Sequence, residues 1–191
     1  MTVFDTSRTE ITYSLGHVAL TDIPDERLRR LAFYWYSQRA ERALPSREDV
    51  DPLDLPSGVL PNMILLDIVG SERYRRFRFR LVGTAIYTHV GRELTGLHID
   101  EALPEPYLSY VAFTHTTAAD RRCPVYSETL YHDQGNFVNG ITYRLVLPLA
   151  SDGEAADMIM TCQFWVRRGD KSRWEGNWRT VQPLTQLVDI G

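Results

Sequence analysis

Side chains that could bind a metal are widely spaced in this sequence. The five histidines are His17, His89, His98, His115 and His132. Zinc sites often place two ligands in an HxH or HExxH spacing, and no pair of these histidines does so. The phosphate-binding and nucleophile motifs GxGxxG, P-loop and GxSxG are absent too. The sequence therefore predicts no metal site and no nucleotide site of a common type.

The two cysteines, Cys123 and Cys162, form no CxxC pair. Two thiols are too few for a disulfide framework, so we interpret both as reduced. A nucleophilic pair of either thiol with His115 would require the two to meet in space, and no local signature supports it. Cys162 falls on the apolar side of an alternating segment, where cysteine usually acts as a small buried side chain.

One carboxylate raises the alternative of an enzyme. Most acidic residues cluster in segments that read as loops and turns, whereas Glu128 lies in a strand-like segment. Enzymes on a cone-shaped α+β scaffold, such as those similar to ketosteroid isomerase, need a carboxylate base inside an apolar cavity. Glu128 buried and facing a pocket with Tyr126 or His115 would favour an enzyme, and Glu128 at the surface would argue against one.

Composition excludes some classes of function. Hydrophobic residues make up 43% of the chain, charged residues 24%, and the formal net charge is −4. Nucleic-acid binding relies on a concentrated basic surface, so we expect no nucleic-acid partner. The dense arginine run at 73–80 alternates with aromatic residues, which favours a strand with one solvated face. With no apolar span long enough for a membrane and no secretory signal, we expect a cytoplasmic protein without a membrane partner.

The elements follow from periodicity. A helix is predicted from about 24 to 43, beginning at a proline and ending before Leu44-Pro45. Its four consecutive aromatic residues, Phe33 to Tyr36, would cover most of its circumference. This pattern favours a helix packed between its own domain and a second chain, and tyrosines lying flat with solvated hydroxyls are the alternative.

Period-two alternation predicts five strands, near 63–69, 77–81, 125–131, 141–149 and 158–166. Helical segments, including a helix at 106–120, lie between the second and third of them. We therefore predict an α+β fold in which a five-stranded antiparallel sheet and its helices enclose a cavity. We divide the chain into a tail (1–22), a flanking helix (23–44), a domain (45–168) and a C-terminal tail (169–191) packed on the domain.

Four segments in this order carry a resemblance to a known family. They are LPSR at 44–47 followed by DVDP at 49–52, RFRFRLVGT at 76–84, GRELTG at 91–96, and YRLVLPL at 143–149. With them the chain resembles the PAS superfamily, and within it a bacterial family of stand-alone PAS-like proteins (PAS_5 type). The resemblance implies a PAS-like five-stranded antiparallel sheet with a helical insert between strands 2 and 3 and an N-terminal flanking helix. It supplies no ligand and no catalytic residue.

Other members of the superfamily bind flavin or haem, so both cofactors are considered for this chain. Flavin-binding photosensors of this superfamily carry an Asn-Cys-Arg-Phe-Leu-Gln motif that is absent here, so we do not expect flavin. Haem-binding members use a histidine on the helix before the third strand, where His115 lies, with His89 and His98 nearby. Because a lone histidine is more often structural, we predict no cofactor and keep haem as the alternative.

The predicted inward faces supply candidates for a ligand pocket, whose alternative is ordinary core. These candidates are Arg80, Tyr87, Phe113, His115, Tyr126, Tyr143, Met160 and Cys162. We expect a sensory or regulatory module that is not an enzyme, carries no output domain, and binds a small ligand or a signalling protein. We also expect a homodimer that uses the aromatic helix or the outer face of the sheet. Its candidate interface residues are Phe33, Tyr34, Trp35, Tyr36 and Trp165.

Overall fold

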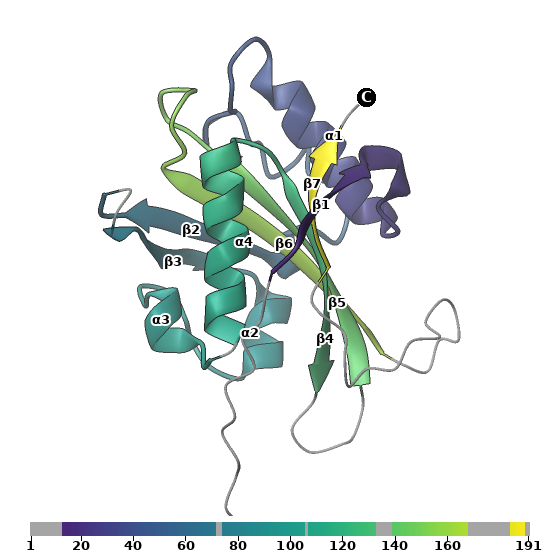
Figure 1. Ribbon diagram of the computed structural model, residues 1–191, viewed down its shortest axis with the longest axis vertical. Coiled ribbons are helices and arrows are strands. Elements are labelled where there is room, and N and C mark those ends of the chain that lie inside the picture. The colour runs from purple at the N-terminus through teal and green to yellow at the C-terminus, as the bar shows by residue number, and fades with distance from the viewer. Residues whose placement is uncertain (1–12, 72–73, 106, 133–138, 168–183, 190–191) are drawn as a thin grey trace, which may run out of the picture.

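The fold is built on one mixed sheet of seven strands in the order β1-β7-β4-β5-β6-β2-β3 (Figure 1). The computed structural model describes residues 13–71, 74–105, 107–132, 139–167 and 184–189. The strands are β1 (Leu15–Ala19), β2 (Met63–Val69), β3 (Arg76–Val82), β4 (Val125–His132), β5 (Asn139–Leu149), β6 (Met158–Arg167) and β7 (Leu184–Asp189). All neighbouring strands pair antiparallel except β1 and β7, which are parallel.

Helices cover both faces of this sheet. On one face lies α1 (Glu26–Arg39), and on the other lie α2 (Thr84–Val90), α3 (Ile99–Ala102) and α4 (Tyr107–Arg121). Figure 1 shows α4 crossing the strands on the near side, with α2 and α3 beside its lower end. Two short 3₁₀ turns, Leu20–Asp22 and Leu60–Asn62, precede α1 and β2. None of the described helices is long and apolar enough to cross a membrane.

Alternation along the strands divides the interior into two cores. In β5, Leu145 and Leu147 pack with α1, whereas Val146 between them packs with the helices of the other face. Neighbouring strands follow the same rule: in β6, Met160 faces α1 and Ile159 faces α4. Since successive side chains point to opposite faces, a sheet covered on both sides must bury every position of its central strands.

The first helix begins at an acidic cap. The Asp25 carboxylate accepts hydrogen bonds from the backbone N–H groups of Arg27 at 2.9 Å and Leu28 at 3.4 Å, which satisfies donors that the helix itself leaves open. The helix ends at Arg39, earlier than predicted, because the backbone reverses at Ala40 with φ of 51°.

A close backbone approach fixes the start of α2. A Cβ on Gly83 would lie 2.4 Å from the carbonyl oxygen of Pro61, so only glycine fits between β3 and α2. The helix then ends at Gly91, whose φ is 74°, in the left-handed region that favours glycine. Both glycines are therefore required by the backbone conformation.

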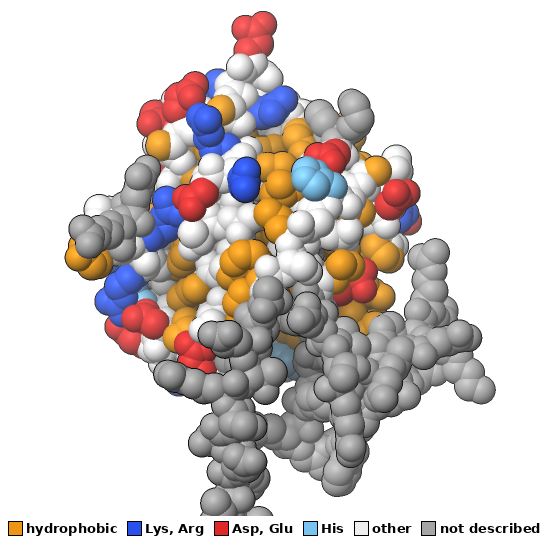
Figure 2. All heavy atoms as spheres, in the orientation of Figure 1, with side chains coloured by type: hydrophobic (Ala, Val, Ile, Leu, Met, Phe, Trp, Pro, Cys, Tyr) orange, Lys and Arg blue, Asp and Glu red, His pale blue; other side chains and the backbone are white. Residues whose placement is uncertain are grey.

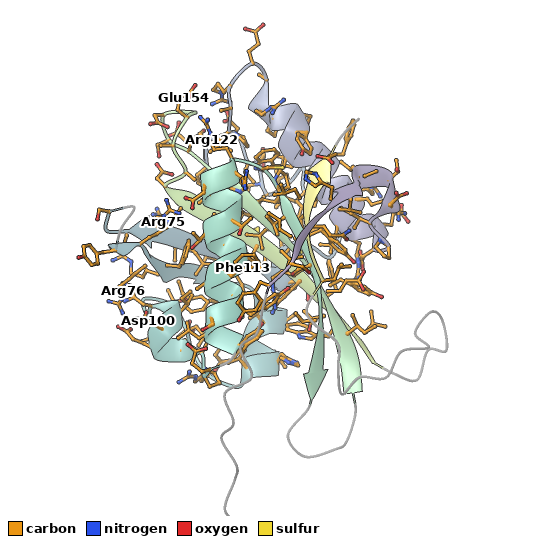
Figure 3. The ribbon with its side chains drawn as sticks, viewed as in Figure 1. Arg75, Arg76, Asp100, Phe113, Arg122 and Glu154 are labelled. Carbon is orange, nitrogen blue, oxygen red and sulfur yellow. The ribbon has the colours of Figure 1, made fainter. Side chains whose placement is uncertain are left out.

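The arginine run becomes the solvated face of β3. Arg76 pairs with Asp100 at 2.8 Å, and Arg78 and Arg80 both pair with Asp67. Figure 3 shows Arg76 and Asp100 side by side, reaching out from β3 and α3. On the face drawn in Figure 2, basic and acidic side chains are mixed, and the basic ones do not gather into one patch.

The sheet differs from the predicted five antiparallel strands. Five of its strands correspond to the predicted ones, and β1 and β7 extend it beyond β4. They are short segments from opposite ends of the chain, and the parallel partner of β1 lies about 170 residues away in sequence, so no local pattern announces the pairing. Trp174 and Trp178 of the expected tail lie outside the described residues.

Candidate functional site

A cavity of about 520 Å³ lies between the sheet and the helices α2, α3 and α4. Its size is typical of small-molecule sites. Apolar side chains from two strands and all three helices form one part of its wall: Ile64, Leu66, Phe79, Ile86, Leu94, Ile99 and Val111. Polar side chains from the central strands form another: Thr129, Thr142, Arg144, Thr161 and Gln163.

The polar part lies on neighbouring strands in register. Thr129 of β4 is paired with Thr142 of β5, and Arg144 of β5 is paired with Gln163 of β6. Directly paired residues project from the same face of a sheet. These side chains therefore form a polar floor on the face that α4 covers.

Arg144 is the charged centre of this floor. Its side chain is buried, with only 2% of the residue exposed. Its Nε donates a hydrogen bond to Oε1 of Gln163 at 3.0 Å, and its Nη2 donates one to the hydroxyl of Tyr107. Its Nη1 has no hydrogen-bond partner among the described residues. No carboxylate within the described residues forms an ion pair with this arginine.

His115 lies next to this charge and is neutral. Its Nδ1 donates to the backbone carbonyl of Val111 at 2.7 Å. Because a neutral ring carries its one proton on Nδ1, Nε2 accepts a hydrogen bond from the Thr161 hydroxyl at 3.0 Å. Burial, together with the positive charge of Arg144, lowers the pKa of His115 from 6.5 to about 3. The imidazole is uncharged at neutral pH, with both nitrogens engaged.

The haem alternative does not fit His115. An axial histidine offers a ring nitrogen to iron, and here each ring nitrogen already makes a hydrogen bond within the protein. His89 also lines the cavity, where its ring stacks on Trp165 at 4.1 Å between centroids. The described residues contain no cluster of three potential metal-binding side chains.

A family model for the PAS domain, PAS_5, matches residues 24–163. The chain belongs to this PAS family. Among solved structures, this PAS domain is similar to the Rhodobacter sphaeroides LOV protein, with 11% identity, a TM-score of 0.43, and coverage of 76% of this chain and 69% of that one. A structure titled "RsLOV d2 variant" gives 13% identity, a TM-score of 0.45, and coverage of 77% and 69%. No curated protein matches the chain.

Of the eight predicted pocket residues, His115 is the one that lines the cavity of this PAS domain. The expected position of four others is wrong: Tyr126, Tyr143, Met160 and Cys162 pack on the opposite face, in the core beneath α1. These four residues lie on the more apolar side of their strands, where the cavity was expected. Because helices cover both faces, that side is filled by α1, and the cavity lies on the more polar side.

The other three predicted pocket residues lie outside the cavity as well. Arg80 is on the solvated side of β3, paired with Asp67, and Tyr87 is half exposed on α2. Phe113, labelled in Figure 3, projects from α4 and stacks on Tyr13 with ring centroids 4.9 Å apart. Phe113 and Tyr13 belong to a shallow surface depression beside β1.

The aromatic helix packs mainly within its own domain. Trp35 is fully buried, and its Nε1 donates to the carbonyl of Pro148 at 2.8 Å. The Tyr34 hydroxyl lies at the 45–56 loop, and the Tyr36 hydroxyl donates to the backbone of β7. Only Phe33 of the four is largely exposed, at 67%. Trp165, the fifth predicted interface residue, lines the cavity instead.

Of the groups considered for catalysis, His115 lines the cavity, whereas Glu128 and the two cysteines do not. Glu128 accepts a hydrogen bond from the Tyr126 hydroxyl at 2.7 Å, and the two-residue spacing places both on the α1 side of the sheet. Burial raises the thiol pKa of both Cys123 and Cys162, and neither lines the cavity. An enzyme similar to ketosteroid isomerase is therefore not supported.

Sequence reasoning missed the residues that form the polar floor. Arg144, Thr161 and Gln163 occupy the polar positions of alternating strands, which a one-sided sheet would turn toward water. One signal was available: β5 and β6 are the central strands of the sheet, and central strands in a covered sheet expose neither face. A long cation in the middle of such a strand calls for a buried partner.

Proposed function

We propose that this PAS domain is a sensory or regulatory module that binds a small molecule in the cavity under α4. The observation that carries the proposal concerns Arg144, a buried residue that lines the cavity of about 520 Å³. The Nη1 atom of this arginine has no hydrogen-bond partner among the described residues. Buried polar groups are normally hydrogen-bonded. A ligand that occupies the cavity would supply the missing acceptor.

The described residues of the cavity wall favour binding over catalysis. The one carboxylate among its described lining residues is Glu105, whose Oε2 accepts a hydrogen bond from the backbone N–H of Ser109. The imidazole of His115 is held neutral between two fixed partners. General acid–base chemistry needs a group with a pKa near the working pH, and the pKa of His115, lowered to about 3 by burial and the Arg144 charge, is far from neutral.

A signal would leave through the sheet to α1. Arg144 contacts the cavity, and the next residue, Leu145, packs under α1. The hydrogen bond from Trp35 to Pro148 ties α1 to the same strand. A ligand that shifts β5 would therefore also displace α1, and a protein partner that binds α1 could respond to that displacement.

The test is native mass spectrometry of freshly purified protein, combined with its absorption spectrum. We expect a co-purified small molecule, or a mass shift when candidate ligands are added, and no haem or flavin absorbance. Protein that stays ligand-free against a broad metabolite library would overturn the proposal.

We also propose that the chain is a homodimer, through the face of α1 that carries Phe33. Phe33 is 67% exposed and lines a surface depression with Leu20, Tyr34, Leu55 and Pro56, and neighbouring apolar side chains at the surface are typical of an interaction site. Light scattering should give twice the chain mass for the wild type and a shift toward monomer for Phe33→Ser. The matched control is Tyr74→Ser, at an equally exposed aromatic in the turn between β2 and β3. A wild-type protein that is monomeric at high concentration would refute the dimer.

A further inference from the structure

We infer that the ligand is a small organic acid with a single carboxylate and an apolar body, and that its carboxylate binds Nη1 of Arg144. This inference rests on the proposed function of the cavity and adds the chemical class of its ligand. Three observations carry it: a donor without a partner on a buried cation, the charge balance of the cavity wall, and the apolar part of that wall.

The open donor has a fixed direction. The guanidinium is planar and presents its donors in a rigid fork. Gln163 and Tyr107 hold Nε and Nη2, which fixes the plane of the group and so the direction of the Nη1 hydrogens. A buried cation without a counter-charge is costly. A carboxylate is the acceptor that matches this fork best, and it also neutralises the charge.

A second buried polar group without a partner lies on the neighbouring strand. Ser127 of β4 is directly paired with Arg144 of β5, so their side chains project from the same face. Ser127 is fully buried, and its Oγ has no hydrogen-bond partner among the described residues. Ser127 is not among the residues that line the cavity, and the Arg144 side chain extends toward β6, where its Nε donates to Gln163. The partner of the carboxylate is therefore Arg144 alone.

Charge selects a single carboxylate. Arg144 is the one arginine or lysine in the described wall, His115 is neutral, and Glu105 adds a negative charge at the edge. A dicarboxylate or a phosphate dianion would bring a second negative charge into a site with one cation. Uncompensated buried charge is strongly disfavoured, so a monoanion fits and a dianion does not.

The apolar wall requires an apolar body on the ligand. Most of the remaining wall is apolar, with side chains of β2 and β3 beside the polar floor and side chains of the three helices, among them Leu66, Phe79 and Ile86. Removing apolar surface from water lowers the free energy of the bound state. An aromatic or short aliphatic acid can bind Arg144 through its carboxylate and contact the apolar wall with its body. Ordered water alone would accept a hydrogen bond from Nη1 but would leave the apolar wall in contact with water.

The test compares acids with their neutral amides on the wild-type protein. The probes are benzoate against benzamide and hexanoate against hexanamide, measured by calorimetry and by the fluorescence of Trp165 at the cavity wall. We expect each acid to bind at least about 10-fold more tightly than its amide, since a hydrogen bond to a charged group is stronger than a neutral one. Inorganic phosphate should bind more weakly than benzoate.

Variants then assign the contact. Arg144→Met should weaken benzoate binding about 10- to 100-fold, with little effect on benzamide. Arg144→Lys should recover part of the affinity, because it keeps the charge and loses the fork. The matched control is Arg78→Met, which removes an exposed arginine on β3 and should leave benzoate binding unchanged. Thermal melts confirm that each variant is folded.

The outcomes separate the two proposals. Amides that bind as tightly as acids, or acid binding that survives Arg144→Met, would overturn the carboxylate and leave the cavity as a site for neutral molecules. Acids that fail to bind while phosphate or a dicarboxylate binds would overturn the single-charge argument. If neither acid, amide nor any library compound binds, the carboxylate inference and the proposed function both fail.

Discussion

Acidification should destabilise this PAS domain through His115, and a variant can isolate the effect. In the folded chain the pKa of His115 is about 3, because burial and the Arg144 charge disfavour the protonated ring. In the unfolded chain the ring takes its ordinary pKa near 6.5. The unfolded state therefore binds a proton between these two values and the folded state does not. Stability falls as the pH drops below 6.5, and the loss continues down to about 3.

The magnitude follows from the two pKa values. At pH 7.5 the ring is neutral in both states and the contribution is close to zero. At pH 5 the unfolded state is favoured by about 2 kcal/mol through this one group. The buried carboxyl of Asp25, whose pKa is lowered, changes the total in the same direction, since hydrogen bonds and the charge of Arg27 outweigh its burial. The contribution of Asp25 is the same in the wild type and in a His115 variant, so it cancels when their free energies of unfolding are subtracted.

The assay is urea denaturation followed by circular dichroism at pH 7.5, 6.5 and 5. His115→Gln should be less stable than the wild type at pH 7.5, because it loses the bonds to Val111 and Thr161. The difference should shrink by about 2 kcal/mol on going to pH 5. Trp35→Phe, which removes a buried hydrogen bond and no titrating group, is the control and should differ from the wild type by the same amount at each pH. A constant difference between wild type and His115→Gln, or an NMR titration of His115 near pH 6.5, would refute the reasoning.

Three further predictions concern stability and use the same denaturation assay. Trp35→Phe should cost about 1–3 kcal/mol, because the carbonyl of Pro148 is left without its indole donor; an unchanged midpoint would contradict this. Gly83→Ala should cost about 1–3 kcal/mol, since its Cβ would clash with the Pro61 carbonyl, and wild-type stability would show that the loop yields. Asp25→Ala should cost about 1 kcal/mol by removing the helix cap, with Asp25→Asn, a good cap, as the milder comparison.

Most of the elements could be predicted from the sequence, since they depend on local patterns. The helix 106–120 is found at Tyr107–Arg121, and the strand 63–69 is found as predicted. The seven-stranded sheet could not be predicted in the same way. The pairing of β1 with β7 joins Leu15 to Thr185, and nothing in either short segment specifies a partner so far away in sequence.

The location of the site depended on which side of the sheet is functional, and alternation alone does not decide that. A strand that alternates apolar and polar residues is usually read as core on one side and water on the other. Here α1 seals the apolar side through Trp35 and its neighbours, so Met160 and Cys162 become ordinary core. The polar side is buried too, under α4, with Arg144 and Ser127 at its centre.

Burying polar and charged side chains on that face costs free energy that an apolar core would not cost. The positions of Ser127, Arg144 and Gln163 could hold apolar side chains, as Val125 and Val146 do on the same face. Replacing a buried charge by a well-packed apolar residue is often neutral or stabilising. Arg144→Met should therefore raise the midpoint of the empty protein, or leave it unchanged, while it removes acid binding. A marked loss of stability in Arg144→Met would instead show that the arginine holds the fold together through Tyr107 and Gln163, and the case for a ligand would lose its main support.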